Sequence, residues 1–390
     1  MSASVEAPLY LDFAASTPPA DEVVEAMLPW LRHAHANPHA DHWHGHRANQ
    51  ALEEAREAVA MLVGAAPETI VFTSGATEAN NLALKGMLTS QGACSRLWLT
   101  DIEHKSLREP AQFLGGQGIE VERIAVSSTG TLSPTALAEA LSRHGGANGL
   151  VAVTHGNNEI GTLQPVAALG EVVHAYGHWL HVDASQSAGR VPLDVEALGC
   201  ELLCVSSHKL YGPGGIGALY VDPELRERLQ PQMHGGGQER GLRSGTVAPF
   251  LAVGFGTAAR LAQRRLAEDA AHLRRLTDTF IGTLDAHGVR YDWVGEPEQR
   301  LPGHVSLRFP GLDAEDLLAM LAPALSASTG SACAAGELRA SSVLRALGLD
   351  ERTAGEVIRF TFGRSTLRGA VQCAAARVAA ATVRVAERSS

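Results

Sequence analysis

The sequence predicts an α/β protein with a mostly parallel sheet between helices, followed by a smaller α+β domain. From about Asp21 to Tyr220, stretches with helical periodicity alternate with short apolar runs, and this alternation is typical of a parallel sheet with helices on both faces. Near Val247 the pattern changes to one long helical stretch followed by shorter strands. The chain of 390 residues also exceeds what one hydrophobic core usually supports.

In the first part, helices are expected over residues 51–63 and 79–88, where apolar side chains recur with helical spacing. The strands are expected in short apolar runs at residues 69–72, 97–99, 150–153, 180–182 and 202–205. In such a sheet, ligands bind beyond the carboxyl ends of the strands. Functional residues are therefore sought at these strand ends.

In the second part, a helix rich in Arg, Ala and Leu is expected over residues 258–286, and strands are expected at 304–309 and 357–362. The first dozen residues are expected to fold back onto this part. The predicted large domain is therefore residues 14–258, and the predicted small domain is residues 1–13 together with 259–390.

The charge balance argues against several classes of protein. Asp and Glu outnumber Lys and Arg by 42 to 32, which gives a net charge of −10. No direct nucleic-acid or membrane-surface binding is expected, because such binding needs basic patches. The N-terminal residues lack the pattern of a signal peptide, and no apolar run is long enough to span a bilayer.

The cysteines favour a reducing, cytoplasmic location. Their number is odd, five, and no C-x-x-C pair occurs, so neither a disulfide framework nor a zinc site is expected. Four of the five are expected to be mostly buried thiols without a chemical role.

Two motifs point to functions that their context does not favour. Residues 212–217 fit the dinucleotide pattern G-x-G-x-x-G, but residues 216–221 resemble a strand, whereas a nucleotide site needs a helix after the motif. Residues 234–237 (H-G-G-G) resemble an esterase oxyanion loop, but the sequence contains no G-x-S-x-G to supply a nucleophile.

Six histidines lie between His33 and His46. Their spacing is irregular and no cysteine lies nearby, so a polar loop is expected rather than a metal site. Whether this cluster binds metal stays open at this point.

Three strand ends carry residues suited to pyridoxal-phosphate (PLP) chemistry. Lys209 follows a buried strand, where a lysine loses its proton more readily and suits Schiff-base chemistry; Ser206 and His208 flank it as phosphate ligands. Asp183 ends another strand, where a carboxylate can cap a helix or pair with a pyridinium nitrogen. Residues 69–80 form a strand, a turn and a helix start, which is either a phosphate site or an ordinary helix cap.

Longer motifs carry a resemblance to the group I (NifS/IscS-type) cysteine desulfurases, which are fold-type I PLP enzymes of the class V aminotransferase superfamily. The motifs extend over nearly the whole chain, in the order of that family: residues 10–12, Asn37-Pro38 with His42 and Gly45, 73–78, 103–105, 157–161, 181–183, 207–209, 211–213, 234–237, 243–246, 330–333, 343–348 and 358–360. The resemblance implies a seven-stranded sheet in the large domain, a PLP cofactor and a homodimer.

It also implies a role for each matching residue. Lys209 would hold PLP and later move the Cα proton, Asp183 would pair with the pyridine nitrogen, and His104 would stack over the ring and assist proton transfer. Gln186 and Asn158 would contact the hydroxyl side of the ring. The phosphate ligands would be Ala76, Thr77, Ser206 and His208, with Thr246 from the second subunit. Arg359 and Asn37 would bind the substrate carboxylate, for which the planar Arg side chain is suited.

Cys333 is the candidate nucleophile. It lies among small residues, from Ser326 to Gly336, a composition that packs poorly and can stay mobile. Its thiolate would take sulfur from L-cysteine as a persulfide, release alanine, and pass the sulfur to an acceptor protein. The segment 334–341 departs from the Ser/Thr-rich stretch and proline of many group I members. The acceptor therefore stays open among iron–sulfur cluster biogenesis, tRNA thiolation and DNA phosphorothioation.

Two alternatives remain. One is another class V PLP enzyme, such as a selenocysteine lyase or an aminotransferase; the latter would not need Cys333. The other is a catalytically silent scaffold, against which the presence of Lys209, Asp183, His104 and Cys333 argues.

Overall fold

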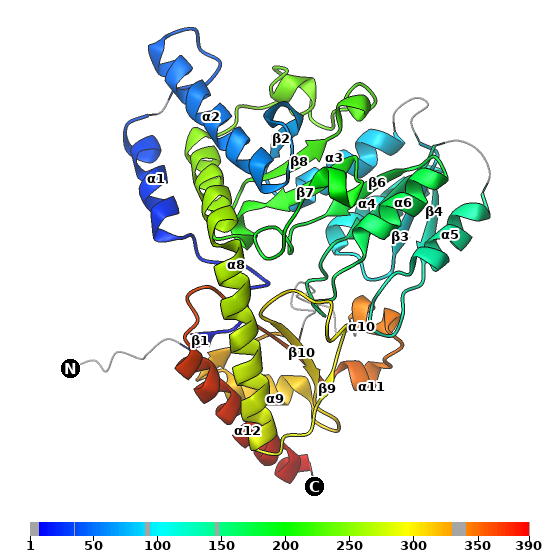
Figure 1. The fold of residues 1–390 in the computed structure, drawn as a ribbon, viewed down its shortest axis with the longest axis vertical. Helices are drawn as coiled ribbons and strands as arrows, with labels where there is room; N and C mark the ends of the chain where they lie inside the picture. Colours follow the sequence, from blue (N-terminus) through cyan, green and yellow to red (C-terminus); the bar gives the residue numbers. More distant parts are fainter. Residues whose placement is uncertain (1–7, 35, 90–93, 145–147, 330–340, 390) are drawn as a thin grey trace.

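The computed structural model describes residues 8–34, 36–89, 94–144, 148–329 and 341–389 (Figure 1). Its largest element is a seven-stranded sheet with the strand order β2-β8-β7-β6-β5-β3-β4. The strands are β2 (Ile70–Thr73), β3 (Arg96–Thr100), β4 (Glu120–Ile124), β5 (Leu150–Thr154), β6 (Trp179–Asp183), β7 (Leu202–Ser206) and β8 (Gly217–Val221). β4, β3, β5, β6 and β7 pair in parallel, whereas β8 is antiparallel to both β7 and β2. The predicted fold class is confirmed.

Both faces of this sheet are buried, as expected for a parallel sheet between helices. Leu203 and Val205 of β7 join one hydrophobic cluster, whereas Leu202 and Cys204 of the same strand join another on the opposite face. Helices on the first face include α2 (Trp43–Leu62), α5 (Pro134–Ser142) and α6 (Val166–Ala175). Those on the second face are α3 (Ala76–Leu88) and α4 (Lys105–Gly116). The short α7 (Val195–Leu198) joins β6 to β7.

The strand that follows the G-x-G-x-x-G motif is β8, so this motif does not open a helix, in agreement with the prediction. Of the seven strands of this sheet, β4 was the one not predicted. Its residues Glu120, Glu122 and Arg123 are charged and at least partly exposed, and β4 pairs only with β3 at the edge of the sheet. An edge strand tolerates such side chains because it is only partly covered.

α2 begins eight residues before the predicted helix, within the histidine-rich stretch. The His42 side chain caps this helix by accepting a hydrogen bond at Nδ1 from the Gly45 N–H (3.1 Å). His46 lies 3.3 Å from Asp41. In the described part of the chain, which does not include His35, no group of three or more potential ligands has a metal-binding arrangement.

A single helix, α8 (Pro249–Ala286), connects this sheet with the rest of the chain (Figure 1). It packs against α1 (Asp21–Arg32) and α2 at one end and against α12 (Arg368–Ser389) at the other. It starts nine residues before the predicted helix, at Pro249, and proline suits the first position of a helix. The predicted domain boundary at residue 258 therefore falls inside α8, and the division into two domains stays a prediction.

Below the large sheet in Figure 1 lies an antiparallel sheet with the order β12-β10-β9. Its strands are β9 (Asp292–Trp293), β10 (His304–Arg308) and β12 (Val357–Thr361), and the helices around it are α9 (Ala314–Leu321), α10 (Ser342–Ala346), α11 (Glu351–Ala354) and α12. Residues 9–10 lie against this part of the chain, because β1 (Leu9–Tyr10) pairs with β11 (Leu325–Ser326); the assignment of residues 1–13 to the small domain stays a prediction. Among the helices described, none is both long and apolar enough to cross a membrane.

Candidate active site

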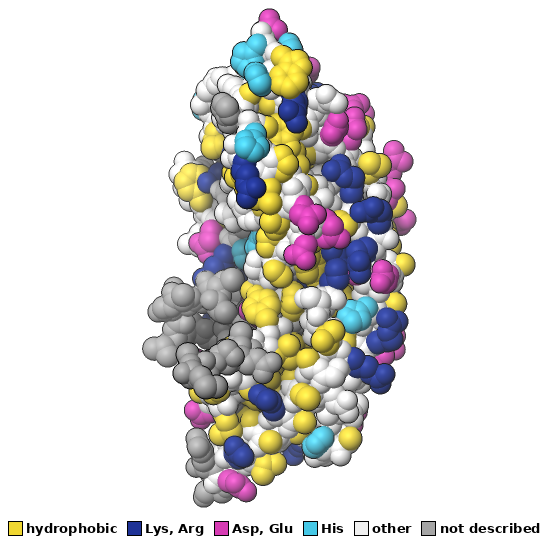
Figure 2. Space-filling model, turned by 90° about the vertical axis from the view of Figure 1, so that its left-hand side faces the viewer, with side chains coloured by type: hydrophobic (Ala, Val, Ile, Leu, Met, Phe, Trp, Pro, Cys, Tyr) yellow, Lys and Arg dark blue, Asp and Glu magenta, His cyan; other side chains and the backbone are white. Residues whose placement is uncertain are grey.

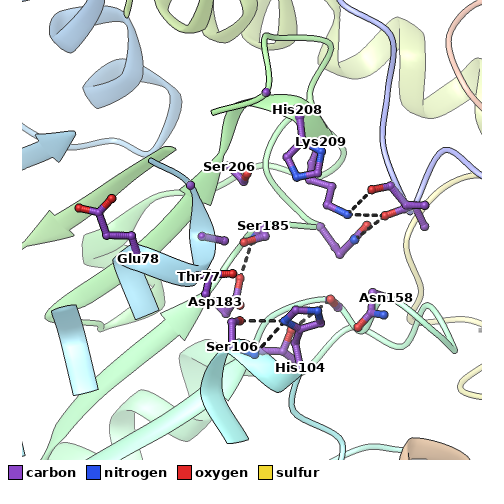
Figure 3. Close-up of a pocket in the computed structure, with 18 of the residues that line it drawn as sticks. Thr77, Glu78, His104, Ser106, Asn158, Asp183, Ser185, Ser206, His208 and Lys209 are labelled. Atoms are coloured by element: carbon purple, nitrogen blue, oxygen red, sulfur yellow. Dashed lines mark hydrogen bonds between the residues drawn. The ribbon is translucent and has the colours of Figure 1, made fainter. Parts of the chain in front are cut away.

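A cavity of about 470 Å³ lies beyond the carboxyl ends of the parallel strands. The last residues of β5, β6 and β7, namely Thr154, Asp183 and Ser206, all line it. The predicted site residues in its lining are Ala76, Thr77, His104, Asn158, Asp183, Gln186, Ser206, His208, Lys209 and Arg359. Figure 3 shows Lys209 and His208 on one side of the cavity, with His104 and Asn158 on the other.

Lys209 enters the cavity from a 3₁₀ turn (Ser207–Lys209) directly after β7. Its Nζ donates hydrogen bonds to the carbonyl oxygens of Ala14 (2.6 Å) and Ala15 (2.8 Å). Gln186 Nε2 donates to the same Ala14 carbonyl (2.9 Å). The segment after β1 therefore orients the lysine side chain.

Asp183 is held rigidly at the end of β6. Its side chain is buried, Oδ2 accepts a hydrogen bond from Asn80 Nδ2 (2.7 Å), and Oδ1 accepts one from the Ser185 N–H (2.9 Å). A carboxylate that accepts hydrogen bonds in this way keeps one orientation. It is suited to a cationic partner in the cavity.

His104 caps α4. Its Nδ1 accepts a hydrogen bond from the Ser106 N–H (3.1 Å) and lies 2.8 Å from Ser106 Oγ. Burial lowers the pKa of His104, and Asp183 opposes this while Lys209 and basic groups of α4 add to it. The ring is therefore neutral at pH 7.

The start of α3 forms an open site for an anion. Gly75, the N-cap residue, has φ of 147° and supplies no side chain to cap the first turn. A Cβ on Gly217 would lie 2.7 Å from the Gly75 Cα, so the two backbones can approach this closely only because residue 217 is glycine. Thr77 of α3 and Ser206 of β7 complete this end of the cavity. Burial, with a smaller effect of Lys209, lowers the pKa of His208 to about 4, so His208 is neutral.

Arg359 of β12 reaches the cavity from the smaller sheet. It is buried, its Nη1 donates to the Asn158 carbonyl oxygen (2.8 Å), and its Nη2 donates to Asp12 Oδ1 (2.5 Å). Within the described part of the chain its Nε is buried without a hydrogen-bond partner. A buried donor of this kind calls for an acceptor, and a carboxylate in the cavity would supply one.

Of the predicted site residues that the structure describes, two are not in the cavity lining. Asn37 is exposed, and its Oδ1 accepts a hydrogen bond from the His39 N–H (3.0 Å). Thr246, which was expected to act in the second subunit, is also exposed. Cys333 lies outside the described residues.

The other four cysteines are free thiols. Cys94, Cys200 and Cys204 are buried, and burial raises the pKa of each thiol, that of Cys94 to about 12. These three are therefore unreactive. The expectation of a buried thiol is wrong for Cys373, which is exposed on α12, outside the cavity lining.

No role was predicted for two residues that shape this site, Asn80 and Glu103. Asn80 of α3 is fully buried and bonds to both Asp183 and Ser106. Burial raises the pKa of Glu103 to about 8, although its carboxyl oxygens accept hydrogen bonds from Thr100 Oγ1 (2.6 Å) and from the Thr154 N–H (2.7 Å). Glu103 falls in the family motif 103–105 and Asn80 in the segment 69–80, but residue type alone does not tell a buried from an exposed side chain.

Comparisons with known proteins point to the same family as the sequence motifs. The aminotransferase class-V family model matches residues 9–372. A cysteine desulfurase IscS from Neisseria meningitidis serogroup C is 42% identical over 375 residues, 95% of this chain and 91% of the relative. A solved NifS-like protein superimposes with a TM-score of 0.87 at 31% identity, covering 96% of this chain and 98% of the other. A structure described as SspA in complex with cysteine gives a TM-score of 0.79 at 33% identity, with 92% and 100% covered.

Proposed function

The chain belongs to the class V aminotransferase family and acts as a cysteine desulfurase, and we propose that it does so with PLP bound at Lys209 and with Cys333 as the sulfur-carrying thiol. The observation that supports this proposal best is the cavity itself. It brings a lysine, a fixed carboxylate, a neutral histidine and a buried arginine together at the ends of the parallel strands.

The residues of the cavity fit PLP. Lys209 would hold the cofactor covalently, and Asp183 would pair with its ring nitrogen. The free N–H groups at the start of α3, with Thr77, Ser206 and His208, would bind its phosphate. Gln186 and Asn158 would lie at its hydroxyl side. When bound, PLP withdraws electrons from the substrate and makes its Cα proton acidic.

The substrate carboxylate would bind Arg359. Two nitrogens of this side chain already have protein acceptors, and these hydrogen bonds fix the guanidinium plane. The Nε is left for the substrate. Asn37, the other predicted carboxylate ligand, is exposed in the single chain, and we propose that it contributes only in the dimer.

Lys209 and His104 would share the proton transfers. A lysine amine that is released from its cofactor is a base of suitable strength beside the substrate Cα. His104, neutral at pH 7, lies across the cavity from Lys209 (Figure 3). It would assist at the opposite side of the substrate.

Cys333 would complete the reaction. Its thiolate attacks the sulfur of L-cysteine, the Cβ–S bond of the substrate breaks, and Cβ takes up a proton to give L-alanine. The sulfur stays on Cys333 as a persulfide, so atoms and electrons balance without an external oxidant. An acceptor protein then takes this sulfur.

We further propose that the enzyme is a homodimer and that Thr246 completes the phosphate site of the second subunit. Of the residues of α1 only Val23 is buried, while Val24, Leu31 and Trp43 of α1 and α2 are exposed. Figure 2 shows apolar side chains running along this face of the molecule. We also propose a cytoplasmic location, because reducing conditions would keep Cys333 a thiol.

The test is incubation of the PLP-loaded protein with L-cysteine and a reductant, with sulfide and alanine measured together. Equal amounts of both products are expected. Cys333→Ser should abolish sulfide release and keep the bound chromophore, whereas Lys209→Ala should lose both. A Cys333→Ser protein that desulfurates at the wild-type rate would refute the nucleophile assignment. Comparing alanine release from cysteine and selenocysteine tests the selenocysteine lyase alternative.

A further inference from the structure

Asn80 stands at the centre of a buried hydrogen-bond network behind the cavity. Its Nδ2 lies 2.7 Å from Asp183 Oδ2 and 2.9 Å from Ser106 Oγ, and its Oδ1 lies 2.8 Å from His181 Nε2. Ser106 Oγ in turn lies 2.8 Å from His104 Nδ1. Asn80 and His181 are fully buried, and Asp183 and Ser106 are 5% exposed. We call these five residues the Asn80 network.

The direction of each hydrogen bond in the Asn80 network follows from its chemistry. An ionised carboxylate only accepts, so the side of the Asn80 amide that faces Asp183 is the NH₂ group. Its second N–H then donates to Ser106 Oγ. The Asn80 carbonyl oxygen faces His181, which therefore donates from Nε2.

The same reasoning fixes the proton of His104. Ser106 Oγ receives the Asn80 N–H, so its own O–H is directed at His104 Nδ1. The Ser106 backbone N–H points at the same Nδ1 from 3.1 Å. Two donors converge on this nitrogen, and a proton on Nδ1 would oppose both.

We propose that Asn80 and Ser106 are positioning residues that hold His104 as the Nε2–H tautomer and thereby present a proton donor, rather than a base, to the cavity. Asn80 also orients Asp183. One buried amide therefore fixes the orientation of both Asp183 and His104, the two groups that would contact the ring of the cofactor. In the reaction, which rests on the proposed function, His104 would then donate a proton or hydrogen bond from Nε2. Lys209 would remain the base.

The charged groups that act on His104 are Asp183 of β6, Lys209 after β7, and Lys105 and Arg108 of α4 itself. None of them is altered in the variants chosen below. A changed protonation of His104 in the Ser106 variants, which add no acidic or basic group, would therefore report the loss of the network hydrogen bonds.

The experiment observes the imidazole nitrogens directly. Full-length protein labelled with ¹⁵N-histidine, without cofactor and with PLP, is titrated by NMR, and the His104 signals are assigned from His104→Gln. In the wild type we expect an unprotonated Nδ1 and a protonated Nε2. Ser106→Ala removes one donor to Nδ1, so the pKa of His104 should rise by roughly one unit, the equivalent of one neutral hydrogen bond. Ser106→Thr, which keeps the hydroxyl, should restore it.

Asn80→Asp removes the N–H groups that donate to Asp183 and Ser106. The new carboxyl would lie beside buried Asp183, so the two acids share one proton, and its oxygen accepts the Ser106 O–H and turns it away from His104. Asn81→Asp is the control for an added acid on α3, one residue further along, where the Asn81 side chain donates to the Thr77 carbonyl oxygen of its own helix (2.9 Å). The pKa of His104 should rise further in Asn80→Asp than in Asn81→Asp.

Two results would overturn the proposal: a wild-type His104 that carries its proton on Nδ1, or a Ser106→Ala protein in which neither tautomer nor pKa changes. If Asn80→Asp does not fold, the comparison of Ser106→Ala with Ser106→Thr still decides. The NMR signals do not depend on turnover. A failure to desulfurate cysteine would thus count against the proposed function and leave this inference standing.

Discussion

Gly217→Ala is expected to damage the proposed phosphate-binding end of the cavity, at the start of α3, through a backbone collision. The new Cβ would lie 2.7 Å from Gly75 Cα and 2.7 Å from the Val205 carbonyl oxygen, whereas ordinary contacts begin at 3.4 Å. The difference, 3.4 − 2.7 = 0.7 Å, is the distance by which β8 or the turn at Gly75 must move. Backbone atoms cannot rotate away as a flexible side chain does. Overpacking of this kind costs about 1–3 kcal/mol of folding free energy.

The same displacement would misplace the start of α3. Because a shift of roughly 1 Å in a binding group can cost about 100-fold, the affinity for PLP should fall by about 10- to 100-fold. Urea denaturation followed by circular dichroism measures the stability, and titration of the cofactor-free protein with PLP measures the affinity.

Gly282→Ala is the matched control for this substitution. Gly282 lies in α8, is exposed, and a Cβ there would have no atom within 4 Å. Alanine should stabilise the helix by up to about 1 kcal/mol and leave the PLP affinity unchanged. The reasoning is refuted if the Gly217→Ala protein binds PLP as tightly as the wild type and is equally stable.

Three further predictions test the interior and the cavity. Arg56→Ala should lower the free energy of unfolding by about 3–5 kcal/mol, because it leaves buried Glu239 without its charged partner. The two carboxyl oxygens of Glu239 lie 2.7 and 2.9 Å from the Arg56 nitrogens. A loss below about 1 kcal/mol in urea denaturation would contradict this prediction. Arg359→Lys should raise KM for cysteine by about 10- to 100-fold, since a single ammonium cannot keep the contacts with Asn158 and Asp12 and also donate from the position of Nε. An unchanged KM in steady-state kinetics would remove Arg359 from the substrate site. Burial lowers the pKa of His155 from 6.5 to about 4, so the unfolded chain binds this proton first and stability falls as the pH drops from 6.5 towards 4. At pH 5 the loss relative to pH 8 should be on the order of 2 kcal/mol, and His155→Gln should lack this part of the dependence in denaturation curves at both pH values.

The strand ends could be predicted because their sequence signal is local. Residues 150–153, 180–182 and 202–205 are apolar runs, each lies in a strand of the structure, and the polar residue that ends or follows the strand lines the cavity. Topology then brings these ends together at one edge of the sheet. Lys209 and Asp183 could therefore be found by reading the chain alone, whereas Asn158 was named from the family resemblance.

The parts that were missed depend on contacts between distant residues. Asn80 becomes a network residue only because α3 packs its buried face against β6 and the start of α4. The pair between Arg56 and Glu239 joins residues 183 positions apart. In the sequence, Asn80, Arg56 and Glu239 look the same as polar residues on a solvent-exposed helix face or loop. β4 was missed because its charged residues are typical of a loop. They form a strand because they pair with β3 at the edge of the sheet.

The continuity of α8 has a consequence for how the molecule melts. Its first half places Phe255 in the hydrophobic cluster beneath the seven-stranded sheet, and its second half places Phe280 in the cluster beneath the smaller sheet. Unfolding one cluster alone would strip half of the helix of its packing, and a helix owes most of its stability to such packing. Both sheets should therefore unfold together on heating, in one cooperative transition. Calorimetry should show a single peak, whereas two independently unfolding domains would give two.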